Sequence, residues 1–102
     1  MLVGLFQVMK LKDKVAIVTG AGRGVGRAIA LAFAREEADV VVVSRTLSDV
    51  EETAAQVRAL GRRALALRVD VSRMEDVESM VKSTLRDFGR VDVLVNNAGI
   101  LG

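Results

Sequence analysis

The residues of this chain with the clearest chemical use are four alternating glycines, in the segment Thr19-Gly-Ala-Gly-Arg-Gly-Val-Gly26. Glycine tolerates positive φ and close backbone approach, and the free amides at the start of a helix favour an anion. The template G-x-G-x-x-G does not fit, whereas T-G-x-x-x-G-x-G fits through Gly20, Gly24 and Gly26. The segment therefore predicts a diphosphate site, and the alternative is a tight turn without a ligand. The predicted phosphate loop consists of Gly20, Ala21, Gly22, Arg23, Gly24, Val25 and Gly26.

The residues after the second apolar run predict which dinucleotide this loop would hold. An Asp or Glu about 20 residues beyond the glycines accepts a hydrogen bond from the ribose 2′-OH of NAD. This chain has Ser44 and Arg45 there, and no carboxylate until Asp49. Arginine pairs with a 2′-phosphate, and Arg23 of the loop is expected near the same ribose. NADP(H) is thus preferred over NAD(H), although either arginine alone also fits a solvated surface charge.

Two further polar segments follow the third and fourth apolar runs. Asp70, beside Val71, can accept from an adenine amino group, or its charge can favour the next helix N-terminus, and the two roles are compatible. Asn97 can bond a ribose or the neighbouring backbone, while Ala98 and Gly99 would line the cofactor. Taken alone, the Asn-Asn pair is equally typical of a polar turn.

The elements that must position these residues alternate along the chain. Short, valine-rich apolar runs predict strands at 15–18, 40–43, 64–67 and 91–95, mostly buried on both faces. Three amphipathic helices are predicted between them. This order gives an α/β fold, a Rossmann-type three-layer α/β/α arrangement with a parallel sheet of order 3-2-1-4. The predicted helical stripes are Val25, Ala28, Ile29, Ala32 and Phe33; then Val50, Ala54, Val57 and Leu60; then Val77, Met80, Val81, Thr84, Leu85 and Phe88.

Helix ends also carry signals. Ser48-x-x-Glu51 and Ser72-x-x-Glu75 predict capping boxes at the second and third helices. Gly61 and Gly89 predict left-handed residues just beyond the same two helices.

Composition excludes several classes of function. The chain has 102 residues, a net charge of +2 and neither Cys nor His, so disulfides and the common zinc sites are excluded. No run approaches the roughly 20 apolar residues of a membrane span. Arg58, Arg62, Arg63 and Arg68 are explained by solvation, so no nucleic-acid partner is expected. We expect a cytoplasmic protein, with an N-terminal extension at 1–9 and a partial NADP-binding domain at 10–102.

The motifs at 19–26, 70–71 and 96–99, in this order and spacing, resemble the short-chain dehydrogenase/reductase family. The chain is similar to its 3-oxoacyl-acyl-carrier-protein reductase-like members. The resemblance implies a homo-oligomeric parent enzyme that transfers hydride between NADPH and a small carbonyl or alcohol substrate. It also implies that the phosphate loop holds pyrophosphate, Asp70 and Val71 hold adenine, and Asn96 ties the central strands together.

Departures from the family pattern concern catalysis. The family's catalytic Ser and Tyr-x-x-x-Lys lie beyond the fourth strand, and this chain has no Tyr and ends at Gly102. Lys82 and Ser83 lie on the third predicted helix, where the family places no catalysis, so no residue is assigned a catalytic role. We expect the chain to be truncated after its fourth strand and inactive alone. A non-catalytic dinucleotide-binding module and an unstable inactive piece are the alternatives.

Overall fold

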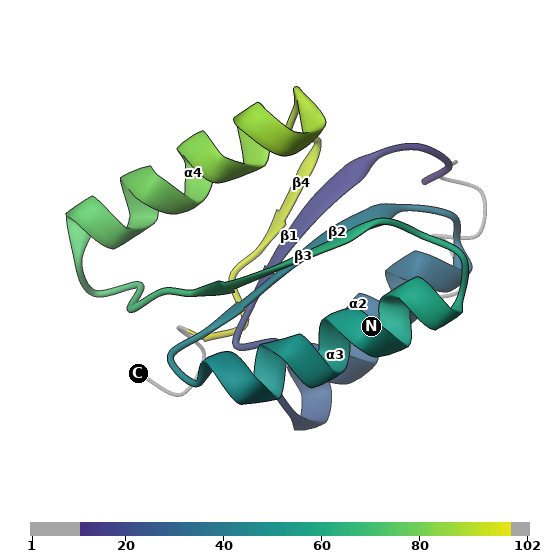
Figure 1. The fold of residues 1–102 in the computed structure, drawn as a ribbon, viewed down its shortest axis with the longest axis horizontal. Helices are drawn as coiled ribbons and strands as arrows, with labels where there is room; N and C mark the ends of the chain where they lie inside the picture. Colours follow the sequence, from purple (N-terminus) through teal and green to yellow (C-terminus); the bar gives the residue numbers. More distant parts are fainter. Residues whose placement is uncertain (1–10, 99–102) are drawn as a thin grey trace.

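The computed structural model describes residues 11–98, so the predicted extension at 1–9 and Gly99 lie outside the described part of the chain. Strands and helices alternate through these residues as predicted (Figure 1). The elements are β1 (Val15–Thr19), α2 (Gly24–Arg35), β2 (Asp39–Ser44), α3 (Leu47–Ala59), β3 (Ala64–Arg68), α4 (Met74–Phe88) and β4 (Val93–Val95).

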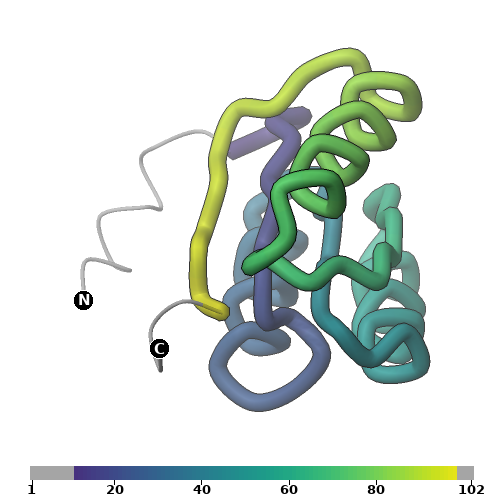
Figure 2. Tube along the Cα trace, turned by 90° about the vertical axis from the view of Figure 1, so that its left-hand side faces the viewer, coloured from purple at the N-terminus to yellow at the C-terminus, as the bar shows by residue number. Residues whose placement is uncertain are grey.

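The strands form one parallel sheet of order β3-β2-β1-β4, which confirms the predicted fold class and strand order. β1 pairs with β2 over its whole length, from Val15 opposite Asp39 to Thr19 opposite Val43. α2 and α3 cover one face of the sheet and α4 covers the other (Figure 1). Figure 2 shows β4, in yellow, along the outer edge beside β1. All strands therefore end at the same edge of the sheet, where the predicted site residues follow them.

The valine runs of β1 and β2 fill two apolar cores, one on each face of the sheet. Successive side chains of a strand point to opposite faces. Val40 and Val42 pack with α2 and α3, whereas Val41 and Val43 pack with α4. Both strands are buried along nearly their whole length, as continuously apolar runs predict, and they form a rigid base for the loops that follow them.

α2 contacts the sheet through a face that overlaps the predicted one only in part. Its buried residues are Gly26, Ala30 and Ala34, while Val25 is 67% exposed and Ala28 is also exposed. Small residues on the inner face let the backbone of α2 lie close to β1. The larger side chains of Ile29, Leu31 and Phe33 are partly buried and pack against the same core. The predicted stripe is confirmed at Ile29 and Phe33, which pack against the core, and wrong at Val25 and Ala28, because it weighted large apolar residues over Gly and Ala. Three other stripe residues, Leu60, Val81 and Leu85, are also exposed.

The two predicted capping boxes are wrong. The residues that precede α3 and α4 are Thr46 and Arg73, and neither makes a side-chain capping hydrogen bond. The Ser72 hydroxyl instead donates to the Asp70 carboxylate, at 2.6 Å, before the helix begins. The glycine predictions are confirmed, because Gly61 and Gly89 both adopt positive φ, at 88° and 79°.

All four strands differ from their predicted bounds by one or two residues at one or both ends, and the start of β4 and the end of β3 lie next to residues discussed below. β4 begins at Val93, and Asp92 just before it bonds to β1 through both backbone and side chain. The Asp92 amide donates to the Val15 carbonyl, and the Val15 amide donates to Asp92 Oδ2, each at 2.8 Å. β3 ends at Arg68, one residue beyond the predicted run, and Asp70 and Val71 lie in the loop before α4.

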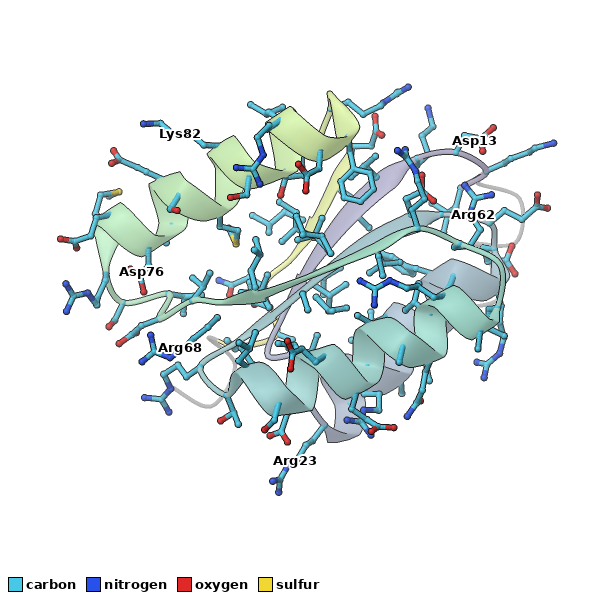
Figure 3. The ribbon with its side chains drawn as sticks, in the orientation of Figure 1. Asp13, Arg23, Arg62, Arg68, Asp76 and Lys82 are labelled. Atoms are coloured by element: carbon cyan, nitrogen blue, oxygen red, sulfur yellow. The ribbon has the colours of Figure 1, made fainter. Side chains whose placement is uncertain are left out.

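The ends of β1 and β2 that lie away from the predicted site carry two residues with positive φ and a buried carboxylate that pairs with two arginines. Glu37 follows α2 with φ of 70°, and Asp13 precedes β1 with φ of 62°. The Asp13 amide donates to the Glu37 carbonyl at 2.9 Å. Nearby, the buried carboxylate of Asp39 pairs with Arg62 at 3.1 Å and with Arg63 at 2.9 Å. In Figure 3, Arg62 and Asp13 lie at the end of the molecule away from Arg68 and Asp76.

Candidate functional site

A pocket of about 490 Å³ lies at the carboxyl edge of the sheet. Its walls come from the loops that follow β1, β2, β3 and β4, and from the first turn of α3. Ligands of open α/β sheets bind at this edge. The predicted site residues that line it are Gly20, Gly22, Arg23, Ser44, Arg45, Asp70, Val71 and Ala98. The lining residues that sequence reasoning did not assign to the site are Val43, Thr46, Asp49, Val69 and Ser72.

The phosphate loop leaves β1 at Thr19 and enters α2 at Gly24, so the segment does not continue as strand. Gly20 and Gly24 adopt positive φ, at 62° and 54°. A Cβ on Gly26 would overlap the carbonyl oxygen of Gly20, and a Cβ on Gly20 would lie 2.8 Å from Asn97 Nδ2. Glycine is thus required at these positions by conformation or by contact, which is a stronger constraint than an ordinary tight turn imposes.

Two side chains hold the carbonyl groups of the phosphate loop. The buried Thr53 hydroxyl donates to the Ala21 carbonyl at 2.8 Å, and Arg27 Nη2 donates to the Gly22 carbonyl at 2.6 Å. Arg27 Nε also donates to Thr53 Oγ1 at 2.9 Å, which links the two. Sequence reasoning missed both residues. The available signal was a polar Thr53 in the apolar stripe of α3, between Val50 and Val57.

The segment after β4 braces the loop from the other side. Asn97 Nδ2 donates to the Gly20 carbonyl at 3.2 Å, so this side chain bonds to neighbouring backbone, one of its two predicted roles. The Ala98 amide donates to Thr19 Oγ1 at 3.1 Å, and the same hydroxyl lies 3.2 Å from Asn96 Oδ1. Strands β1 and β4 are thereby tied together where the pocket begins.

The charged residues of the pocket are arranged differently from the prediction. Arg23 Nε lies 3.0 Å from Asp49 Oδ2, with the arginine side chain 81% exposed and the aspartate 24% exposed. Figure 3 shows Arg23 projecting outward from the loop beside the two helices. Arg45 lies exposed on the pocket wall. Of the two predicted phosphate ligands, one is therefore already paired with a carboxylate.

Asp70 lies on the wall of the pocket, in the loop between β3 and α4. Its Oδ1 accepts from the Ser72 hydroxyl at 2.6 Å and from the Ser72 amide at 3.0 Å, and these bonds lower the pKa of its carboxyl group. The positive charges of Arg45 and Arg73 lower this pKa further. The Asp70 amide donates to Asp76 Oδ2 at 2.9 Å, which fixes the loop. The pocket thus keeps an ionised acceptor at neutral pH.

The other predicted site residues support the loop or lie outside the pocket. Ala21 is fully buried, and its amide donates to the Val43 carbonyl at 3.0 Å. Gly26 is buried against Gly20, whereas Val25 is exposed. Gly99 lies outside the described residues.

The described residues 11–98 offer hydrogen-bond donors and ion-pair partners rather than a metal centre. No group of three or more carboxylate, His or Cys side chains among them could hold a metal ion. Among the same residues, no helix has the length and apolar character needed to cross a membrane.

Comparisons with known proteins agree with this geometry. The family model described as short chain dehydrogenase matches residues 14–102. The chain is 44% identical over 95 residues to an uncharacterized oxidoreductase of Mycobacterium tuberculosis, covering 93% of this chain and 36% of that protein. It is 41% identical over 93 residues to the short-chain dehydrogenase/reductase homolog YusS of Bacillus subtilis, covering 90% of this chain and 85% of that protein.

Solved structures show the same likeness. The structure of NAD+-bound xylitol dehydrogenase superposes with a TM-score of 0.86 at 40% identity, covering 91% of this chain and 36% of that one. The chain thus spans about a third of the length of this structure and of the mycobacterial relative.

Proposed function

This chain belongs to the short-chain dehydrogenase family, and we propose that it forms the NADP(H)-binding part of an oxidoreductase acting on a small carbonyl or alcohol substrate. The observation that carries the proposal is the phosphate loop, which is held open to the pocket at the carboxyl edge of the sheet. When bound, the nicotinamide cofactor donates or accepts the hydride. The chain's own residues bind and orient that cofactor.

The residues present fit a dinucleotide. Side chains at Gly20 or Gly26 would collide with the chain itself, so the loop can keep this path only with glycine. The amides at the start of α2 lack intrahelical acceptors and favour a diphosphate. Asp70 and Val71 would hold the adenine, and Ser44 and Arg45 the ribose end. Asn97 would position the loop by its bond to Gly20 rather than contact the cofactor directly.

The preference for NADP(H) rests on charge at the end of β2. Arg45 stands on the pocket wall, where NAD-binding units place a carboxylate that accepts from the ribose hydroxyl. Arginine is suited to a 2′-phosphate. A preference for NAD(H) is the alternative, because the similar xylitol dehydrogenase structure contains NAD+.

Titration of the purified chain with NADPH and with NADH tests the proposal. We expect NADPH to bind at least about tenfold more tightly, since one charge-assisted contact contributes about 1.5–3 kcal/mol. Arg45→Asp should reverse the order. Arg68→Asp is the matched control, because Arg68 is exposed on the adjacent strand β3 and does not line this pocket. Equal affinities, or a preference that Arg45→Asp leaves unchanged, would refute the cofactor assignment.

We assign no catalytic residue to this chain. The family's catalytic Ser and Tyr-x-x-x-Lys follow the fourth strand, and residues 1–102 contain no Tyr. We therefore expect the purified chain to bind nucleotide without oxidising NADPH. Steady NADPH oxidation with a carbonyl substrate by the purified 102-residue chain would contradict this expectation.

A further inference from the structure

We infer that Asp49 limits the discrimination between NADP(H) and NAD(H), because it holds the Arg23 guanidinium that a 2′-phosphate would need. This inference rests on the proposed function and assigns a specificity role to a residue outside the predicted site. Asp49 belongs to the first turn of α3 and lines the pocket between the phosphate loop and the end of β2.

The position of Asp49 is fixed by its backbone and by close packing. Its carbonyl accepts from Arg27 Nη2 at 3.2 Å. A Cβ on Gly22 would lie 2.7 Å from the Asp49 Cβ, so the aspartate packs directly against the loop. Its side chain is 24% exposed. Because the residue cannot withdraw without disturbing the loop, its carboxylate stays beside the ribose end of the pocket.

The charges that line the described pocket cancel. Arg23 and Arg45 contribute two positive charges, and Asp49 and Asp70 contribute two negative charges. A 2′-phosphate carries a charge of about −1.5 to −2, so it must share the Arg23 guanidinium with Asp49 and lie near a like charge. A ribose 2′-hydroxyl can instead donate a hydrogen bond to that carboxylate. The Asp49 carboxylate thus disfavours a 2′-phosphate and can accept a hydrogen bond from a 2′-hydroxyl.

Calorimetric titration with adenosine 2′,5′-bisphosphate and with 5′-AMP tests the inference, since these ligands differ only at the 2′ position. Asp49→Asn should tighten bisphosphate binding about three- to tenfold and leave 5′-AMP binding equal or weaker. Glu52→Gln is the matched control, because it removes the same charge from an exposed position of α3 outside the pocket. We expect this control to change the ratio of the two affinities less than twofold.

The Arg23→Gln background tests the mechanism. If Asp49 acts by holding Arg23, the effect of Asp49→Asn should fall at least twofold there. An undiminished effect would overturn that mechanism, and an unchanged ratio in Asp49→Asn itself would overturn the inference while nucleotide binding still stands. Failure of the native chain to bind either ligand would instead contradict the proposed function. Asp49→Ser provides the same measurement if thermal melting shows that Asp49→Asn is unfolded.

Discussion

Replacement of Thr53 by Val is the sharpest test of how the phosphate loop is held. The two side chains have nearly the same shape, so the change removes one hydroxyl without opening a cavity. Thr53 is fully buried, and its hydroxyl donates to the Ala21 carbonyl while accepting from Arg27 Nε. Thr53→Val therefore leaves one loop carbonyl and one guanidinium N–H without these partners.

The expected cost follows from these two groups. A buried polar group that loses its partner costs about 1–3 kcal/mol, and the half-buried Arg27 lies at the low end of that range, so Thr53→Val should lower the free energy of unfolding by about 2–4 kcal/mol. In a domain of this size the Tm should fall by about 10–25 °C. Thr84→Val is the matched control, because Thr84 is also fully buried but its hydroxyl donates to the Met80 carbonyl within α4. That carbonyl keeps its helical amide, so the control should cost less than about 1 kcal/mol.

Two assays separate stability from positioning. Urea denaturation measures the free energy of unfolding of both variants, and NADPH titration at a temperature where both are folded measures affinity. We expect Thr53→Val to weaken NADPH binding at least about fivefold, because the loop carbonyls are no longer held. Equal losses of stability in the two variants, or full affinity in Thr53→Val, would show that this hydroxyl does not position the loop.

Two further predictions concern the contacts around β1. Gly26→Ala should lower the free energy of unfolding by about 2 kcal/mol or more despite alanine's better helix propensity, because its Cβ would overlap the Gly20 carbonyl. Denaturant unfolding should show a smaller loss for Gly24→Ala, which meets open space, and the reverse ranking would contradict the packing argument. Hydrogen bonds from Arg90 and from the Val15 amide lower the pKa of Asp92, so its contribution to stability is present above the unfolded pKa of about 3.9 and is lost as pH falls through the folded value. Stability measured between about pH 5 and pH 2 should therefore fall more steeply in the native chain than in Asp92→Asn, and parallel curves would argue against this role.

The sheet could be predicted from sequence because its signals are strong and local. Valine runs of strand length leave few options for β1 and β2, and helices between parallel strands impose the crossovers. The inner face of α2 could not be predicted in the same way, since it depends on how closely Gly26 and Ala30 let the helix approach β1. The distance between α2 and β1 depends on both elements, so it cannot be derived from the sequence of the helix alone.

The candidate site, like the fold, could be predicted from sequence only in part. The glycine spacing predicts the loop, and the loop indeed links β1 to α2 beside the pocket. The roles of Arg27, Thr53 and Asp49 were not assigned from sequence, because each involves a contact between residues more than 20 positions apart in the chain. The polar Thr53 in an apolar stripe was the one local signal. Ser72 was misassigned for a related reason, since its hydroxyl donates to the nearby Asp70 carboxylate and does not accept from the amides of the helix that it was expected to cap.

The two left-handed residues at the far edge of the sheet bear on how this protein can evolve. Asp13 and Glu37 hold conformations that side chains disfavour by about 1–2 kcal/mol, and they lie at the opposite ends of β1 and β2 from the pocket. Glycine at such a position would relieve part of that strain without touching any pocket residue. A stabilising change at position 13 or 37 could therefore compensate for a destabilising change in the pocket that alters ligand preference. Stability and ligand preference can then change independently during evolution.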